Sequence, residues 1–476
     1  MSERPRRRTK IVATLGPATS DEGSIGALVE AGVDVVRLNL AHGRADDHVR
    51  VARIARERAG EAGRIVGVLA DLPGPKMRSG PIKGGSVALR RGTAFTLAAE
   101  DVEGDERRAS TSVDDLAGKV SEGDSIHLAD GEIVLEVSSI EDGDVRTRVV
   151  RGGVLRTRKG MHLPNAEWAF AAFTDEDRAA LEVARRAEVD LVGLSFVRDA
   201  DDLRRARAAL ANDARKPLLV AKIETRSGVE HIADIVQEAD VVMVARGDLG
   251  IHTPLHSVPL VQKDVIATCN RSGVPVITAT EMLGSMTHAP LPTRAEVADV
   301  ANAVLDGTDA LMLSEETAVG ERPAEAVATM SSIAACAQGR LGAPRDPSPG
   351  AADDPVSWAV ARAAVAAAED LEVAAILCPT RTGATPRRVS SFRPAMPIVG
   401  VSGNEVALGG LAAVWGVVGV HVPEMRAARD PAEEVARATS VCRGAGVIGA
   451  GDLVIVVAGT PGPRAGRTDY VRIVRV

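Results

Sequence analysis

Eight short apolar runs recur along this chain, separated by longer segments with helical periodicity, and no other feature restricts the possible folds as strongly. The runs consist largely of Val, Ile, Leu and Ala, as in strands buried on both faces of a parallel sheet. Intervening segments such as Asp175–Ala187 and Asp299–Leu305 carry apolar residues at helical spacing. Eight strands alternating with helices predict an α/β fold of the (β/α)8 TIM-barrel type. The runs are Lys10–Gly16, Asp34–Leu40, Arg64–Asp71, Asp190–Phe196, Leu218–Glu224, Ala239–Ala245, Val274–Thr280 and Asp309–Leu313.

One insertion interrupts this alternation after the third run. The sequence Leu72-Pro73-Gly74-Pro75 breaks regular structure, and short alternating segments such as Ser125–Leu128 follow it, with Gly-containing turns between them. This pattern is typical of an all-β module. The sequence therefore predicts a barrel made of residues 1–73 and 166–342, with a small β-barrel domain inserted at 74–165. Both ends of the insertion fall near the active face of the barrel, where a small domain can act as a lid.

A second boundary lies in Leu341–Pro355, which contains four prolines. Such a composition is typical of a linker or exposed loop, and we place the linker at residues 343–355. Beyond it a new alternation of strand and helix patterns begins, which predicts a C-terminal α/β domain at 356–476. Its strand patterns are Ala374–Cys378, Pro397–Val401, Val417–Val420 and Leu453–Val457.

The composition narrows the classes of partner. The formal net charge is −8, which argues against bulk binding of nucleic acid or of an anionic membrane. No apolar run approaches the roughly 18–20 residues of a membrane span. The basic residues Arg4 and Arg6 to Arg8 are expected to form a solvated tail. The four cysteines lack metal-site spacing, so we predict neither a zinc site nor a disulfide framework, and we expect a reducing, cytoplasmic environment. They are Cys269, Cys336, Cys378 and Cys442.

Polar side chains gather where the predicted barrel strands end, which is the edge that carries the chemistry in such barrels. Residues i and i+2 of a strand share a face, so Arg37 lies beside Asn39, and Lys222 beside Glu224. A barrel-rim ion pair is the alternative for Lys222 and Glu224, but polar residues at six strand ends favour a shared site. These residues are Arg37, Asn39, Asp71, Ser195, Arg198, Lys222, Glu224, Arg246, Asp248 and Thr280.

The residue types fit phosphoryl transfer. Glu224 and Asp248 can converge on one hard cation, Mg²⁺ or Mn²⁺, because Mg²⁺ takes one or two protein carboxylates plus water and substrate oxygens. Arg37 and Lys222 can neutralise a phosphoryl group in transfer. If a helix starts within Arg246–Gly250, its free backbone N–H groups can hold a carboxylate. A ligand with both a phosphate and a carboxylate would satisfy all of these groups.

An ordered set of motifs over nearly the whole chain resembles the pyruvate kinase family. The segments are Lys10–Pro17, Arg37–Gly43, Ala221–Glu224, Met243–Gly250, Val276–Leu283, Pro292–Asp299 and Asp306–Ala318. The resemblance implies phosphoryl transfer from phosphoenolpyruvate to ADP, which gives pyruvate and ATP. It also implies a homotetramer.

The resemblance assigns roles to individual residues. Lys222 would stabilise the transferring phosphoryl group and the developing enolate, Arg37 would bind phosphate, and Glu224 and Asp248 would bind the divalent metal. The phosphoenolpyruvate carboxylate pocket would consist of Gly247, Asp248 and Thr280, with Thr280 close to the carbon that is protonated. The nucleotide side would consist of Thr14, Pro17, His42, Arg78 and Lys159, the last two presented by the inserted domain.

The monovalent-cation region departs from the K⁺-dependent members of the family. Asn39 and Asp71 are kept, but Ala41 replaces a serine ligand, and Lys76 stands where K⁺-dependent members have a glutamate. Leu72 replaces a threonine of the family motif, but this change matters little, because the family's K⁺ ligand at that position is the backbone carbonyl. An ammonium and K⁺ ~4 Å apart repel each other by about 4 kcal/mol at an effective dielectric constant of 20. We therefore predict that Lys76 substitutes for K⁺ and that K⁺ is not required; in the alternative, Lys76 points into solvent.

Four further positions differ from the family pattern, namely Glu281, Leu291, His162 and Asn165. Glu281 follows Thr280, and the next residue along a strand faces away from the site, so we expect an effect on packing or on a subunit interface. Two alternative functions stay open. One is a barrel aldolase or lyase acting on pyruvate-like carboxylates, and the other is a weakened sensor of phosphoenolpyruvate or sugar phosphates.

The loop Thr380–Thr385 carries three hydroxyls around a glycine at a predicted helix N-terminus, which is a plausible phosphate cradle. It resembles the sugar-phosphate effector loop of the same family through Thr380, Thr382, Gly383 and Thr385. An ordinary strand-to-helix turn with a helix cap is the alternative. The sequence predicts a possible sugar-phosphate or AMP effector without identifying it.

Overall fold

The structure is a computed structural model. It describes residues 7–75, 77–129, 131–165, 171–340, 345, 347–348, 354–427, 430–460 and 467–476. Within these ranges no helix is both long and apolar enough to cross a membrane.

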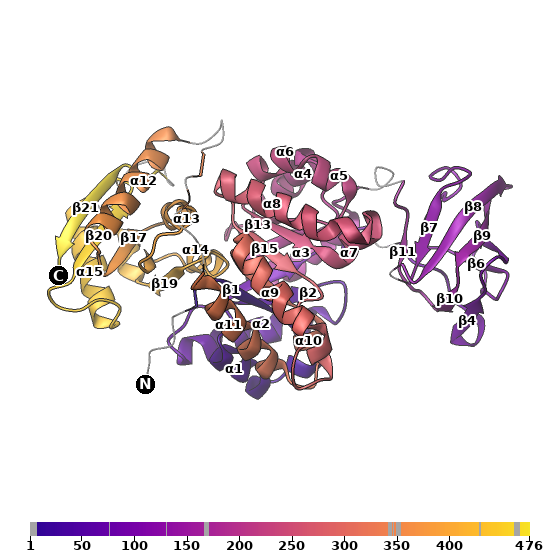
Figure 1. The fold of residues 1–476 in the computed structure, drawn as a ribbon, viewed down its shortest axis with the longest axis horizontal. Helices are drawn as coiled ribbons and strands as arrows, with labels where there is room; N and C mark the ends of the chain where they lie inside the picture. Colours follow the sequence, from indigo (N-terminus) through magenta and orange to yellow (C-terminus); the bar gives the residue numbers. More distant parts are fainter. Residues whose placement is uncertain are drawn as a thin grey trace.

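Eight parallel strands close into a barrel in the centre of the molecule (Figure 1), which confirms the predicted (β/α)8 fold. Each of the eight predicted apolar runs contains one barrel strand. In chain order the strands are β1 (Lys10–Leu15), β2 (Val35–Asn39), β3 (Gly67–Asp71), β12 (Leu191–Leu194), β13 (Leu218–Ile223), β14 (Val241–Ala245), β15 (Val276–Ala279) and β16 (Ala310–Leu313).

Alternation along the strands divides the barrel core into two layers. Side chains such as Val12 and Val220 fill the barrel interior, while neighbours such as Ile11 and Ala221 pack outward against helices. The surrounding helices include α1 (Glu22–Ala31), α2 (Ala45–Glu61), α3 (Asp175–Arg186), α4 (Ala200–Leu210), α6 (Ile232–Glu238), α8 (Val258–Ser272), α9 (Arg294–Asp306) and α11 (Pro323–Gln338).

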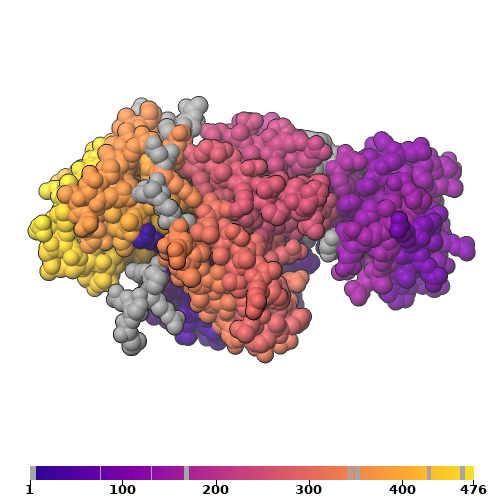
Figure 2. Space-filling model, in the orientation of Figure 1, coloured from indigo at the N-terminus to yellow at the C-terminus, as the bar shows by residue number. Residues whose placement is uncertain are grey.

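A separate β part lies between β3 and β12 in the chain and stands off to one side of the barrel (Figures 1 and 2). It holds a six-stranded sheet in the order β11-β7-β8-β9-β5-β6 and a two-stranded sheet β10-β4. It has its own apolar core around Phe95, Ile126 and Leu135. The strands are β4 (Ser86–Leu89), β5 (Ala94–Ala98), β6 (Arg108–Ser110), β7 (Ser125–Leu128), β8 (Ile133–Glu141), β9 (Asp144–Arg151), β10 (Gly153–Arg156) and β11 (Met161–His162).

The C-terminal part contains a five-stranded sheet in the order β19-β18-β17-β20-β21, with only the last strand antiparallel. The sequence pattern indicated four of these strands and missed the edge strand β21 (Tyr470–Arg475). Ala412 and Ala413, just after α14 (Glu405–Leu411), pack against the interior cluster of the barrel and so tie the two parts together. The other elements are α12 (Pro355–Asp370), β17 (Ala375–Pro379), α13 (Ala384–Ser391), β18 (Ile398–Ser402), β19 (Val417–His421), α15 (Pro431–Gly444) and β20 (Leu453–Ala458).

The prediction of a solvated N-terminal tail is wrong for Arg7 and Arg8. The Arg7 guanidinium pairs with Asp34 at 2.8 Å, and the Arg8 guanidinium lies 5.3 Å from the centre of the Trp415 ring. Asp34 is buried between β1 and β2, and a buried carboxylate is stable only with cationic partners. Arg4 and Arg6 lie outside the described residues.

Candidate active site

Several strands place an apolar side chain inside the barrel and a polar side chain on the same face two residues later, at the strand end. The site therefore lies directly above the apolar interior of the barrel. Val12 is followed by Thr14, Val35 by Arg37, Leu69 by Asp71 and Val220 by Lys222. Since all these strands are parallel, their polar ends meet at one edge of the barrel.

Four of these side chains form a continuous ionic network. Asp71 Oδ2 lies 2.6 Å from Arg37 Nη2, and Asp71 Oδ1 lies 3.0 Å from Lys222 Nζ. Lys222 Nζ also lies 2.9 Å from Glu224 Oε1. The structure therefore brings together Arg37, Lys222 and Glu224 from the predicted site, with Asp71 as the link between the two cations.

Burial and charge shift the pKa values of this network in different directions. Burial alone would raise the pKa of Asp71, but the charges of Lys222 and Arg37 outweigh it and lower the pKa. Burial would lower the pKa of Lys222, but the carboxylates of Asp71 and Glu224 raise it above its ordinary value. Burial raises the pKa of Glu224, Lys222 offsets part of this, and the charges of Asp248 and Asp71 raise it further. Burial and the neighbouring carboxylates thus oppose the charged form of Glu224, and the Lys222 ammonium favours it.

Two groups hold Lys222 and Glu224 in place: Ser195, which was counted among the polar strand ends without a role of its own, and the backbone N–H of Phe196, which sequence reasoning missed. Lys222 Nζ donates to Ser195 Oγ at 2.8 Å, and that hydroxyl donates to the backbone carbonyl of Leu72 at 2.7 Å. The backbone N–H of Phe196 donates to Glu224 Oε2 at 2.7 Å. Period-two alternation from Leu191 through Gly193 already pointed Ser195 inward, but no sequence signal indicated the Phe196 amide.

A short helix, α7 (Arg246–His252), begins directly after strand β14, so the condition that the sequence left open, a helix that starts within Arg246–Gly250, is met. The N–H of Gly247 donates to Thr280 Oγ1 at 2.8 Å, so the structure brings these two predicted residues together. Asp248 is partly buried, and its charge acts on Glu224. Thr280 and Glu281 both have left-handed backbones, with φ of 69° and 53°. Such conformations cost about 1–3 kcal/mol each in residues other than glycine and persist where the surroundings enforce them.

The predicted nucleotide-side residues fall into two groups. Thr14 belongs to the network, because Arg37 Nη1 donates to its hydroxyl at 3.0 Å, whereas Pro17 and His42 are exposed after the ends of β1 and β2. Arg78 and Lys159 lie on the two segments that join the β part to the barrel, where Arg78 forms a β-bridge with Gly160. The structure brings these two together at the base of the β part.

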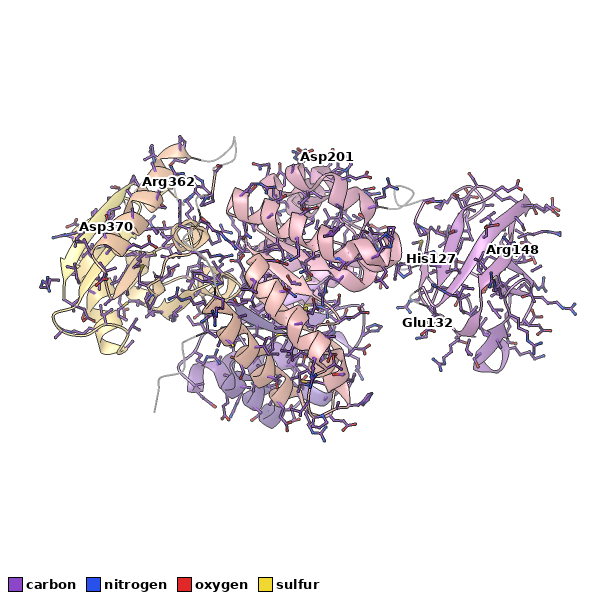
Figure 3. All side chains as sticks on the ribbon, viewed as in Figure 1. His127, Glu132, Arg148, Asp201, Arg362 and Asp370 are labelled. Atoms are coloured by element: carbon purple, nitrogen blue, oxygen red, sulfur yellow. The ribbon has the colours of Figure 1, made fainter. Side chains whose placement is uncertain are left out.

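A cleft of about 580 Å³ separates α7 from the β part. Its lining includes Gly247, Glu281, His127 and Asn165; His127, labelled in Figure 3, lies on the side of the β part that faces the barrel. Glu281 is not in a strand, since β15 ends at Ala279, so the expectation that it faces away as a strand neighbour is wrong. His162 is buried, with its ring 5.6 Å from that of His252 on α7.

The monovalent-cation region is only partly described. Asn39 Oδ1 accepts the N–H of Ala41 at 3.2 Å, and the Leu72 carbonyl accepts the Ser195 hydroxyl. Lys76, the predicted substitute for K⁺, lies outside the described residues.

The loop predicted to bind an effector uses its hydroxyls within the protein. Gly383, with φ of 80°, precedes α13, and its N–H donates to Thr380 Oγ1 at 2.9 Å. The N–H of Ala384 lies 3.4 Å from Thr382 Oγ1, and the buried hydroxyl of Thr385 lies 2.8 Å from that of Thr468. These contacts match the alternative of a strand-to-helix turn.

Comparisons with known proteins match this architecture throughout its length. The family model "Pyruvate kinase, barrel domain" matches residues 6–327, and "Pyruvate kinase, alpha/beta domain" matches residues 358–474. The chain belongs to the pyruvate kinase family. Its members transfer a phosphoryl group from phosphoenolpyruvate to ADP, so the chain is an enzyme of this class, and the family generally uses Mg²⁺.

Individual relatives agree with this assignment. The pyruvate kinase of Geobacillus stearothermophilus is 40% identical over 98% of this chain and 80% of its own length. The pyruvate kinase of Thermococcus litoralis is 38% identical over 100% of both chains. A crystal structure of a pyruvate kinase from Cryptosporidium parvum superposes with a TM-score of 0.88 at 30% identity, covering 99% of this chain and 96% of that one.

Proposed function

We propose that the network of Arg37, Asp71, Lys222 and Glu224 is the centre where this chain transfers the phosphoryl group from phosphoenolpyruvate to ADP. The proposal rests on the position and charge of Lys222. Its ammonium is fixed between Asp71, Glu224 and Ser195 at 2.8–3.0 Å, at the end of the barrel strands, and its raised pKa keeps it charged. A fixed, desolvated cation stabilises charge that develops in a transition state without reorganisation.

Each side chain has a distinct task in this proposal. Arg37 binds the phosphate, and Lys222 neutralises the transferring phosphoryl group and the enolate oxygen left behind. The substrate carboxylate binds at Gly247, Asp248 and Thr280. The proton that ends on the methylene carbon of the enolate passes through the Thr280 hydroxyl. As the new C–H bond forms from the enolate double bond and the C–O group becomes the ketone, water returns a proton to the Thr280 oxygen.

Glu224 and Asp248 fit a divalent cation. Both offer hard carboxylate oxygens, and burial together with the charges of Asp248 and Asp71 raises the pKa of Glu224, so a bound cation would favour its charged form. Within the described residues no group of three or more His, Cys, Asp and Glu side chains is arranged for a metal, which agrees with a site of two carboxylates completed by substrate and water. When bound, Mg²⁺ or Mn²⁺ supplies charge neutralisation at the phosphoryl oxygens.

The inserted part acts in this proposal as a lid. Arg78 and Lys159 lie where the β part joins the barrel, so rotation of that part would move both side chains relative to Lys222. Together with Thr14, Pro17 and His42 they form the nucleotide side. The domain limits at 74–165 and 343–355 stay predictions.

Large apolar side chains on the surface of the isolated chain bear on its assembly. We propose a homotetramer, since Leu255, Leu260 and Leu291 expose 64–75% of their surface in the isolated chain. The protein would act in the cytoplasm. A sugar phosphate or AMP at the Thr380–Thr385 loop would compete with the turn for the N–H groups of Gly383 and Ala384, which already donate to Thr380 and Thr382.

The purified protein should form pyruvate from phosphoenolpyruvate and ADP in an assay coupled to lactate dehydrogenase. Activity should fall to the background rate when EDTA removes the divalent cation and return with Mg²⁺ or Mn²⁺. No pyruvate formation at any Mg²⁺ concentration, with binding of phosphoenolpyruvate intact, would instead identify a sensor. A barrel lyase would release pyruvate from a different substrate without ADP.

Activity should not depend on K⁺. With Na⁺ or tetramethylammonium as the sole monovalent cation, kcat should stay within about twofold of its value in K⁺, because a tethered ammonium at Lys76 supplies the charge. Lys76→Glu should create a K⁺ requirement, and Lys83→Glu on the exposed surface of the β part is the matched control. A many-fold loss of wild-type rate without K⁺ contradicts the role given to Lys76.

A further inference from the structure

Arg246 makes an unusual set of contacts at the back of the proposed site. Its Nη2 donates to the backbone carbonyl of Thr280 at 2.6 Å and to that of Glu281 at 3.1 Å, and its Nε lies 3.2 Å from the Thr280 carbonyl. Its Nη1 donates to Asp299 Oδ2 at 2.7 Å. The planar guanidinium thus spans two consecutive carbonyls on one edge and a carboxylate on the other.

The two carbonyls belong to the strained residues of the site. Thr280 and Glu281 are consecutive left-handed residues that follow the end of β15, and neither is a glycine. Donors fixed on both carbonyls hold this turn in a conformation that it would otherwise leave. The next residue after Arg246, Gly247, donates its N–H to Thr280 Oγ1. Arg246 and Gly247 therefore hold the backbone and the hydroxyl oxygen of Thr280. The hydroxyl itself donates to the Ala279 carbonyl at 2.6 Å, a bond that it has to exchange for the substrate when it transfers its proton.

The opposite edge of the Arg246 guanidinium is held by Asp299, which lies on α9. Asp299 lies one helical turn beyond Glu296, whose carboxylate accepts the N–H groups of Ser285 and Thr293 at 2.7 and 2.6 Å. Two carboxylates of one helix thus hold the segment between β15 and α9, one directly and one through Arg246. The Arg246 side chain is only 11% exposed, so its geometry is set by these partners.

We propose that Arg246, anchored by Asp299, is a positioning residue that aims the Thr280 hydroxyl at the methylene carbon of the enolate. The inference rests on the proposed role of Thr280 in proton transfer and extends it to groups that do not touch the substrate. Lysine cannot reproduce the contacts of Arg246, because a compact ammonium cannot span two carbonyls and a carboxylate in one plane. The proposal predicts that Arg246 acts on proton transfer and leaves nucleotide binding intact.

The test is a double-mutant cycle of Arg246→Lys and Thr280→Ala. The exchange of pyruvate methyl protons with D₂O is followed by NMR in the presence of Mg²⁺ and ATP, and kcat and KM are measured in the forward direction. Arg246→Lys should slow exchange and kcat by about 10–100-fold, below the full effect of a general acid. KM for ADP should stay within about twofold. In the Thr280→Ala background the same substitution should change exchange less than about threefold, because residues that act as a unit are not additive.

Further variants separate positioning from folding. Asp299→Asn, which keeps the side-chain shape and Arg246 itself, should slow exchange in the same direction by a smaller factor. Arg204→Lys, on the exposed face of α4, should leave exchange unchanged. The positioning role is overturned if the effects of Arg246→Lys and Thr280→Ala on exchange multiply in the double variant. It is also overturned if Arg246→Lys raises KM without slowing exchange. An unchanged exchange rate in Thr280→Ala overturns it together with the role of Thr280, whereas a wild-type enzyme inactive with phosphoenolpyruvate and ADP overturns the proposed function.

Discussion

Lys222→Met should lower kcat for pyruvate formation by a factor on the order of 10³ or more, the largest effect that we expect from any single substitution. Mutations of preorganised charges at transferring phosphoryl groups have effects of about this size. Methionine keeps much of the side-chain volume but removes the charge that faces Asp71, Glu224 and Ser195. The coupled lactate dehydrogenase assay, at saturating phosphoenolpyruvate, ADP and Mg²⁺, measures the loss.

The same substitution should also lower stability, and this must be separated from the loss of chemistry. Removing one partner of a buried ion pair costs about 3–5 kcal/mol, because the carboxylates of Asp71 and Glu224 lose a neutralising charge. Thermal unfolding and circular dichroism therefore accompany the assay, which is run well below the unfolding temperature. Lys83→Met, on the exposed surface of the β part, should change neither property. A folded Lys222→Met protein that keeps more than about a tenth of the wild-type kcat contradicts the proposed role of Lys222.

The barrel could be predicted because its signal is repeated eight times. Each strand is buried on both faces, so its sequence is nearly continuous in Val, Ile, Leu and Ala, and errors at single boundaries do not alter the count. The edge strand β21 was missed for the opposite reason. Its residues Val471 and Ile473 are substantially exposed and alternate with arginines, which gives a weak pattern. The short strands β4 and β6 of the inserted part are similarly hard to recognise.

The site could be predicted as a set of residues but not as a geometry. The i, i+2 rule placed Lys222 beside Glu224, and the parallel strands brought Arg37 to the same edge. Sequence could not show that Asp71 joins Arg37 to Lys222, because this depends on the stagger between β3 and β13 around the barrel. Nor could it show the left-handed backbone of Thr280 and Glu281, since both are residues that normally avoid this conformation.

The contacts of the Arg246 side chain could not be predicted for the same reason. Arg246 looked like part of a Gly-containing loop that binds a ligand through its backbone, and its side chain was counted among polar strand ends. Its partners Asp299 and Gln262 lie on α9 and α8, 53 and 16 residues away in the chain. Long-range pairing of this kind leaves no periodic trace in a single sequence.

Asp248→Asn should raise the Mg²⁺ concentration needed for half-maximal activity by about 10²–10³-fold. Loss of one unit charge ~4 Å from a divalent cation removes about 8 kcal/mol of attraction at an effective dielectric constant of 20. The asparagine amide oxygen can still coordinate the cation and recovers part of this, and each 1.4 kcal/mol that remains is about tenfold in affinity. Glu224→Gln should act in the same direction, since its amide oxygen can still accept the Phe196 N–H while the negative charge is lost. Titration of Mg²⁺ in the coupled assay measures both shifts.

If Asp248 binds the metal, Asp248→Asn should weaken Mg²⁺ binding but should not destabilise the protein when the metal is absent. The charge of Asp248 raises the pKa of the buried Glu224, which is a measure of repulsion between the two carboxylates. Asp248→Asn removes that repulsion, while Lys222, which Asp248 also attracts, keeps its close partners Asp71 and Glu224. The protein should therefore unfold at a slightly higher temperature than wild type in EDTA, while the stabilisation by added Mg²⁺ should largely disappear. Asp264→Asn, on the exposed side of α8, should leave the Mg²⁺ titration and the unfolding temperature unchanged. An ordinary structural carboxylate at position 248 would give the reverse, with lower stability in EDTA and an unaltered Mg²⁺ titration, so the two measurements together decide whether Glu224 and Asp248 hold the cation.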